Sequence, residues 1–163
     1  MPTEIERKFL VNKQKWEKSN KGTAHLYRQG YILTDPGKTI RIRLADGKGF
    51  ITIKGRSTGA SRPEYEYTIP ENDASELLDQ FCSAVISKTR YKVRIGGKQW
   101  EVDEFSGDNQ GLITAEIELS SEDEIFELPE WVEREITGDA RYYNSNLSLN
   151  PYRNWRTGKG PDG

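Results

Sequence analysis

Charged and apolar side chains alternate along most segments of this 163-residue chain that have the composition of β-strands. Near the amino terminus, Glu4, Glu6 and Lys8 follow one another at two-residue spacing, and Ile5 and Phe9 lie at positions of the opposite phase. Because successive side chains of a strand point to opposite faces of its sheet, this segment has one charged and one apolar face. The same pattern recurs in six later segments, which indicates a mainly β fold.

These seven segments, together with residues 25–33, predict eight strands. They lie at about residues 3–11, 25–33, 39–45, 49–55, 62–69, 85–95, 99–105 and 112–119. Asp35-Pro36-Gly37, Asp46-Gly47 and Gly96-Gly97 supply turn residues between neighbouring segments. Since closure removes exposed sheet edges, we expect an α+β chain dominated by a closed eight-stranded antiparallel β-barrel with a few peripheral helices.

The segments between these strands predict short helices. Asn12 and Asn72 are placed to cap helices that run to about residues 19 and 81. Ser121 with Glu124 resembles a capping box that opens a short helix ending before residue 129. A short strand is expected at 131–136 and a carboxyl-terminal helix at 139–147. Residues 1–163 are expected to form one domain, with a frayed tail from about residue 157.

Composition excludes several kinds of function. The 24 basic and 26 acidic residues give a net charge of −2, so no charge excess attracts the whole molecule to nucleic acid or membranes. One cysteine, Cys82, and one histidine, His25, exclude Cys- or His-rich metal sites and an intramolecular disulfide. No apolar run is long enough for a signal peptide or a membrane span, so we expect a cytoplasmic protein.

The charged faces have two interpretations. For a single strand, charge facing solvent is the common case, and an antiparallel sheet can repeat that pattern. In a barrel, the same faces would instead line the lumen, where buried charges are costly unless they are paired, hydrated or bound to a ligand. Such a lumen would suit a highly charged ligand, because its basic residues could surround phosphates and its carboxylates suit Mg²⁺ or Mn²⁺. Alternation alone leaves both interpretations open.

Glu4-Ile5-Glu6-Arg7-Lys8 resembles the Glu-x-Glu-x-Lys signature of the CYTH superfamily, the triphosphate tunnel metalloenzymes. Further matching motifs follow in the family's order. They are Gln29-Gly30-Tyr31, Arg41-x-Arg43, Lys54, Glu64-x-Glu66, Lys88-x-Arg90, Asp103 and Glu116-x-Glu118, and the stretch 142–147 is similar to the carboxyl-terminal helix of small bacterial members. The resemblance covers about residues 3–119 and implies a barrel whose lumen holds a linear triphosphate.

The resemblance also implies roles for individual residues. Phosphate oxygens would be bound by Lys8, Arg41, Arg43, Lys54, Lys88 and Arg90. One or two Mg²⁺ or Mn²⁺ ions would be held by Glu4, Glu6, Glu64, Glu66, Asp103, Glu116 and Glu118, with the pair Glu64 and Glu66 alternatively orienting water. A Lys–Tyr pair is thought to be the general base in some small bacterial relatives, and we assign that role to Lys8 and Tyr31, with Tyr27 as the less favoured tyrosine.

The leading functional hypothesis is metal-dependent hydrolysis of inorganic triphosphate to pyrophosphate and phosphate, with side activity on nucleoside triphosphates. A class IV-type adenylate cyclase and a thiamine triphosphatase share the same implied phosphate and metal groups, although no adenine pocket can be identified in the sequence. A non-enzymatic alternative is a module that only binds polyphosphate or nucleotide. A barrel with apolar patches on its outer surface could also form a homodimer, and we keep this as an expectation.

Overall fold

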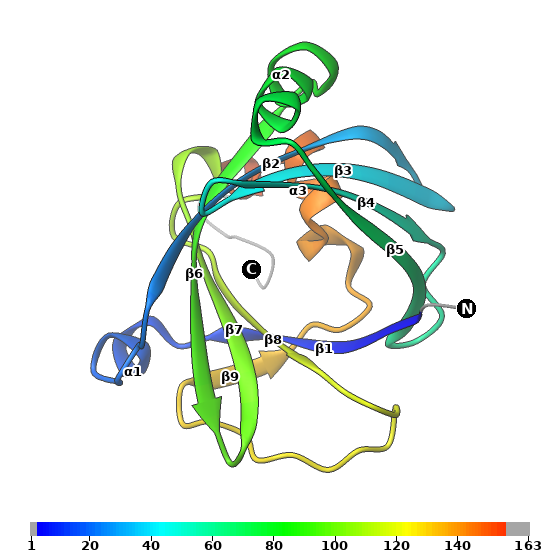
Figure 1. The fold of residues 1–163 in the computed structure, drawn as a ribbon. Helices are drawn as coiled ribbons and strands as arrows, with labels where there is room; N and C mark the ends of the chain where they lie inside the picture. Colours follow the sequence, from blue (N-terminus) through cyan, green and yellow to red (C-terminus); the bar gives the residue numbers. More distant parts are fainter. Residues whose placement is uncertain (1–2, 156–163) are drawn as a thin grey trace.

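The computed structural model describes residues 3–155, which form a nine-stranded antiparallel sheet (Figure 1). The strands are β1 (Thr3–Val11), β2 (Ala24–Asp35), β3 (Lys38–Ala45), β4 (Lys48–Gly55), β5 (Ser61–Ile69), β6 (Val85–Ile95), β7 (Lys98–Phe105), β8 (Ile113–Glu118) and β9 (Val132–Glu135). Their order is β5-β4-β3-β2-β6-β7-β8-β1-β9, and a further pairing of β5 with β1 closes the first eight into a barrel. The predicted fold class is confirmed, with β9 as an additional strand.

Strand β1 completes the barrel with three different partners. Thr3, Glu4 and Ile5 pair with β5, residues 6–10 pair with β8, and the end of the strand pairs with β9. The pairing with β5 spans only three residues of β1 and is supplemented by a hydrogen bond of 3.1 Å from the backbone N–H of Glu6 to the carbonyl of Ala60. The seam between β1 and β5 is therefore narrow.

The helices are short and lie outside or at one end of the barrel. They are α1 (Lys13–Glu17), α2 (Glu71–Phe81) and α3 (Asn144–Leu149), with 3₁₀ turns at Gly107–Asn109, Ala140–Tyr142 and Tyr152–Trp155. The Asn12 side chain caps α1 by accepting a hydrogen bond from the backbone N–H of Lys15, as predicted. The predicted cap at Asn72 is wrong, because α2 begins at Glu71 with Pro70 in the cap position.

Two further predictions about helices need correction. Ser121 and Glu124 do not open a helix: the Glu124 side chain accepts from the Ser120 N–H, and the segment to residue 130 follows the barrel surface without regular structure. The carboxyl-terminal helix is divided into the 3₁₀ turn Ala140–Tyr142 and α3. The predicted frayed tail, residues 157–163, lies outside the described residues. Within residues 3–155, no helix is both long enough and apolar enough to cross a membrane.

The largest hydrophobic core lies outside the barrel, against β1, β6, β7 and β8. Its centre is a group of aromatic rings in tilted or edge-to-face contact: Phe9, Trp16, Trp100, Phe126 and Trp131. These rings come from β1, β7, α1 and the irregular segment before β9, and such ring pairs add stability beyond their buried area. The apolar strand faces are thus covered by α1 and by loop residues, so the charged faces point inward.

Two smaller apolar clusters complete the fold. Ala74 and Leu78 of α2 pack on Ile42, so that α2 covers the outer faces of β3 and β4. The other cluster contains Ile86, Phe105, Leu112, Ile136, Tyr142 and Leu147. Ile86 and Phe105 share the strand faces of Lys88 and Asp103, so this cluster fills one end of the lumen and α3 caps it there (Figure 1).

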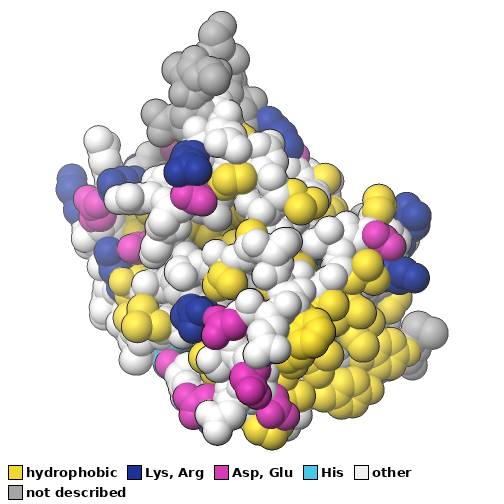
Figure 2. All heavy atoms as spheres, turned by 90° about the horizontal axis from the view of Figure 1, so that it is seen from above, with side chains coloured by type: hydrophobic (Ala, Val, Ile, Leu, Met, Phe, Trp, Pro, Cys, Tyr) yellow, Lys and Arg dark blue, Asp and Glu magenta, His cyan; other side chains and the backbone are white. Residues whose placement is uncertain are grey.

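Part of the outer surface remains apolar and uncovered. Figure 2 shows hydrophobic side chains gathered in one area of the face seen from above. Ile53 on β4 and Tyr67 on β5 are among the large hydrophobic residues that are exposed, at 39% and 57%. Homodimer formation stays a prediction. An interface between two copies would require an exposed apolar surface of this kind.

Candidate functional site

The barrel lumen contains a polar cavity of about 350 Å³ that is lined by residues from all eight barrel strands. Thirteen of the fourteen predicted site residues line it. They are Glu4, Glu6, Lys8, Tyr31, Arg41, Arg43, Lys54, Glu64, Glu66, Lys88, Arg90, Glu116 and Glu118. The structure therefore places the alternating charges in the lumen rather than in solvent, and it brings together residues separated by more than 100 positions.

Asp103 is the predicted site residue that does not line the cavity. It is 1% exposed, and Arg90 donates to both of its oxygens, from Nε at 2.8 Å and from Nη2 at 2.9 Å. The Lys88 ammonium nitrogen lies 2.8 Å from Oδ2. Burial alone would raise the pKa of Asp103, but Arg90 and Lys88 outweigh it and hold this pKa well below its usual value. Because both of its oxygens contact cations, Asp103 is placed to position Arg90 and Lys88, and its role as a metal ligand stays a prediction.

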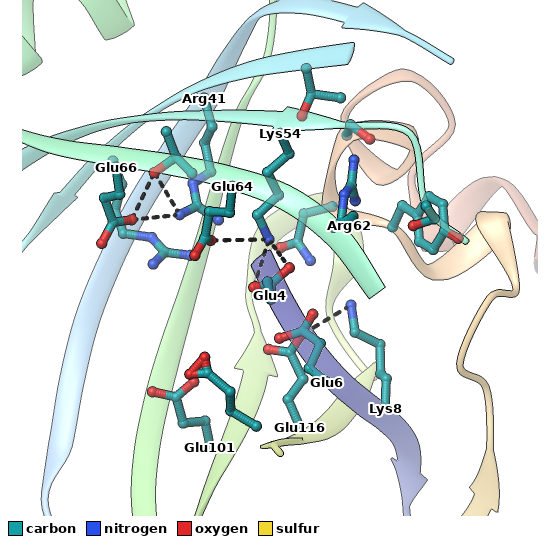
Figure 3. A pocket seen from close by; sticks show the side chains of 18 of the residues that line it. Glu4, Glu6, Lys8, Arg41, Lys54, Arg62, Glu64, Glu66, Glu101 and Glu116 are labelled. Atoms are coloured by element: carbon teal, nitrogen blue, oxygen red, sulfur yellow. Dashed lines mark hydrogen bonds and ion pairs between the residues drawn. The ribbon is translucent and has the colours of Figure 1, made fainter. Parts of the chain in front are cut away.

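The carboxylates gather on the side of the cavity formed by β1, β5 and β8 (Figure 3). Lys54 Nζ lies 2.9 and 3.0 Å from the two oxygens of Glu4 and 3.6 Å from Glu64. Glu116 is held between Lys8 at 3.4 Å and Arg90 at 3.3 Å. Although burial opposes it, these two cations keep the pKa of Glu116 well below its usual value, so it stays ionised.

Glu6 differs from Glu116 because two acids are among its nearest charged neighbours. Burial, then Glu116 and Glu4, raise its pKa well above the usual value. A carboxyl group in this position must hold a proton, repel its neighbours or bind a cation. The atoms here that could bind a metal are carboxylate oxygens, the type of ligand that Mg²⁺ and Mn²⁺ prefer. Among residues 3–155, no three His, Cys, Asp or Glu side chains already stand close enough to chelate an ion. The chemistry of these oxygens fits a divalent metal ion.

Lys8 and Lys88 differ in the direction of their pKa shifts. Burial lowers the pKa of Lys8, but Glu116 and Glu6 outweigh this effect, so its pKa is raised and it remains an ammonium ion. Burial also lowers the pKa of Lys88, and Arg90 and Arg43 add to the decrease while Asp103 opposes it; the result is a pKa of about 7. A general base must be able to lose its proton near neutral pH, and the lowered pKa of Lys88 favours this whereas the raised pKa of Lys8 opposes it.

The guanidinium groups of the lumen are partly unneutralised. Arg43 donates to Gln29 Oε1 at 3.1 Å and lies 4.7 Å from the centre of the Tyr27 ring, which also lies 4.8 Å from Arg90. Burial, Arg41 and Arg90 lower the pKa of Arg43 to about 9. Such crowding of positive groups is unfavourable and would be relieved by an anion.

Several cavity residues were not assigned from the sequence. Arg62 has the same phase on β5 as Glu64 and Glu66, so alternation could have identified it. Glu101 lines the cavity and lies 3.2 Å from Arg90. Asn144, at the start of α3, also lines the cavity, and no strand pattern could have revealed it because it belongs to a helix distant in sequence.

Residues 2–146 match the CYTH domain family. An inorganic triphosphatase of Acetivibrio thermocellus is 52% identical over 157 residues, covering 96% of this chain and 99% of that protein. An inorganic triphosphatase of Nitrosomonas europaea is 38% identical over 154 residues, covering 90% and 97%. A crystal structure of an inorganic triphosphatase superposes with a TM-score of 0.64 at 35% identity, covering 91% and 96%. The fold and the site define a class of protein, a β-barrel whose lumen is lined with charged side chains. The chain belongs to the CYTH domain family.

Proposed function

We propose that this protein hydrolyses inorganic triphosphate to pyrophosphate and phosphate in a reaction that requires a divalent metal. The observation that carries the proposal is a lumen in which cations and carboxylates of seven strands face one cavity of about 350 Å³. The names of the relatives in Acetivibrio thermocellus and Nitrosomonas europaea support the same activity. The apolar cluster at one end of the lumen supports a bare phosphate chain over a nucleotide, since it leaves that end filled.

Binding rests on the cations of the lumen. Lys8, Arg41, Arg43, Lys54 and Arg90 would contact phosphate oxygens, and Arg62 adds a sixth group. Their positive charge stabilises the negative charge that spreads over the phosphoryl oxygens in a loose transition state. Because barrel strands hold these groups before the substrate arrives, little rearrangement is needed during the reaction.

The metal would be held by glutamates. Glu4, Glu6, Glu64, Glu66, Glu116 and Glu118 are the oxygen donors that we propose for Mg²⁺ or Mn²⁺. A bound divalent ion supplies charge neutralisation of the phosphate chain and lowers the pKa of a coordinated water. Family membership implies the divalent requirement, and the choice between these two ions is part of the proposal.

We propose Lys88 as the general base in place of Lys8. Its neutral amine can accept the proton of the attacking water, and Asp103 keeps the amine in place at 2.8 Å. Lys8 then binds phosphate as an ammonium ion. Tyr31, which is buried and near enough to Lys8 to influence its pKa, orients the substrate beside it.

The activity is tested by measuring phosphate release from tripolyphosphate, ATP, thiamine triphosphate and pyrophosphate with Mg²⁺ or Mn²⁺. We expect tripolyphosphate to be the preferred substrate and Arg41→Ala to reduce kcat/KM strongly. Formation of cyclic AMP from ATP would favour the cyclase alternative. Tight triphosphate binding in calorimetry without any product would favour a binding module and would contradict the proposal.

The role of Lys88 predicts a pH dependence. The profile of kcat/KM reports ionisations of the free enzyme, so kcat/KM should rise as the pH increases through about 7 and then level off. Lys88→Arg keeps a positive group that cannot deprotonate, so it should lose about 100-fold or more in kcat/KM and also lose this rise. An unchanged pH profile in Lys88→Arg would assign the base elsewhere. Lys92→Arg, on an exposed position of the same strand, is the control.

A further inference from the structure

Two amide side chains, one buried and one partly buried, connect α3 with the cations of the lumen. Asn144 Oδ1 accepts a hydrogen bond of 3.1 Å from Gln29 Nε2 and another of 3.1 Å from Lys88 Nζ. Gln29 is fully buried, and its Oε1 accepts from Arg43 Nε at 3.1 Å. Together with Asp103 and Arg90, these side chains form one continuous polar network across β2, β3, β6, β7 and α3.

The chemistry of the donors fixes the direction of every bond in this network. Arg43 can only donate, so Gln29 must present its oxygen to Arg43 and its NH₂ group to Asn144. Lys88 also donates in both of its protonation states, so Asn144 must present its oxygen to Gln29 and Lys88 together. The network therefore has one arrangement, and it depends on an oxygen acceptor at position 144.

The two acceptors determine where the remaining position of the Lys88 nitrogen points. Besides its own carbon, Nζ has three tetrahedral positions; Asp103 Oδ2 at 2.8 Å occupies one and Asn144 Oδ1 occupies another. Lys88 lines the cavity although its side chain is only 1% exposed, so the third position is the one left for a group in the lumen. Without Asn144, Asp103 alone would hold the Lys88 nitrogen, and the amine group could rotate about that single contact.

We infer that Asn144 is a positioning residue that aims the Lys88 amine at the attacking water, and that α3 is thereby part of the catalytic machinery. The inference rests on the proposed triphosphatase activity and on Lys88 as its base. Leu147 of α3 packs in the cluster with Ile86 and Phe105, two residues from Lys88 and Asp103 along their strands. The same apolar cluster anchors α3, which carries Asn144, and β6, which carries Lys88. This packing therefore holds Asn144 at a fixed distance from Lys88.

The experiment compares Asn144→Ala and Asn144→Asp with wild type, by steady-state kinetics on tripolyphosphate and by calorimetry of its binding. Asn144→Ala removes the acceptor, so kcat should fall on the order of 100-fold, while KM and the binding constant change less than about threefold. Asn144→Asp keeps both acceptor contacts but sets a second carboxylate beside Lys88, which raises the pKa of its amine, so it should recover most of the kcat that the Ala variant loses only when the pH is above that raised pKa. Asn146→Ala is the matched control, since Asn146 lies in the same helix and bonds only to the Ala140 carbonyl.

The outcomes separate this inference from the proposed function. Wild type without hydrolysis would overturn the function itself. Active wild type with equal kcat in Asn144→Ala would overturn only the positioning role. A similar loss of kcat in Asn144→Ala, Asn144→Asp and Asn146→Ala, accompanied by equal decreases in melting temperature, would assign Asn144 a purely structural role in the cap and would also overturn the inference.

Discussion

Asp103→Asn should lower the free energy of unfolding by about 3–5 kcal/mol, because it leaves Arg90 and Lys88 buried without their shared anion. Urea denaturation at pH 7 measures this value. Since the pKa of Asp103 lies below its ordinary value, the stabilisation is fully present above about pH 4 and declines as the pH falls further. The difference between wild type and variant should therefore shrink in acid.

The surface offers a matched control for this prediction. Arg7 contacts both oxygens of Glu135 at 2.8 and 2.6 Å, which is nearly the geometry of Arg90 with Asp103, but both side chains are about one third exposed. Exposed ion pairs contribute little, so Glu135→Gln should cost about 1 kcal/mol or less. Equal losses in the two variants would show that burial does not determine the contribution of Asp103. The activity of Asp103→Asn should also fall, since Lys88 and Arg90 lose their orientation.

Glu6→Gln should have opposite effects on stability and activity. In the metal-free protein, burial, Glu116 and Glu4 disfavour the ionised carboxylate of Glu6, so a neutral amide of the same shape should raise the melting temperature. This gain should diminish as the pH falls toward about 4, where the carboxyl group is protonated in both the folded and unfolded states. Triphosphate hydrolysis should fall about 100-fold or more, because a metal-ligand oxygen is lost.

Metal titration provides the second measurement for Glu6. A cation that binds only the folded state raises the melting temperature as its concentration increases, so wild type should be stabilised by Mg²⁺ or Mn²⁺. Glu6→Gln should lose most of that stabilisation. Glu133→Gln, on the exposed strand β9, should change neither property. An activity in Glu6→Gln equal to that of wild type would exclude Glu6 from the metal site.

The strand pattern predicted the fold class and the residues of the lumen, because a two-residue period fixes which side chains share a face. It did not determine which face was inside. That choice depends on what covers the apolar faces, and much of the cover is irregular: Phe126 comes from a segment in which the sequence suggested a helix, and Trp131 lies just before β9. The resemblance to a family supplied the choice that periodicity could not.

The roles of individual residues were harder to predict than their location. Asp103 has the phase of a lumen residue, but its two cation partners depend on the register that sets Arg90 opposite it. Lys8 and Lys88 are both lumen lysines, and they differ because Lys8 faces Glu116 and Glu6 whereas Lys88 has Arg90 and Arg43 beside it. Such neighbours come from strands far apart in the sequence, so they become visible only in three dimensions.

The triple pairing of β1 has a consequence for how the chain folds. Its partners β5, β8 and β9 begin at Ser61, Ile113 and Val132, so the first strand to be synthesised can complete its pairing only after most of the chain exists. Contacts between residues this far apart in sequence slow folding. Glu4, Glu6 and Lys8 therefore join the lumen late, and a nascent chain should acquire its barrel and its metal ligands in the same final step. A stalled chain that ends before β8 would leave residues 6–11 of β1 without a partner strand, and such an unpaired edge favours aggregation over partial activity.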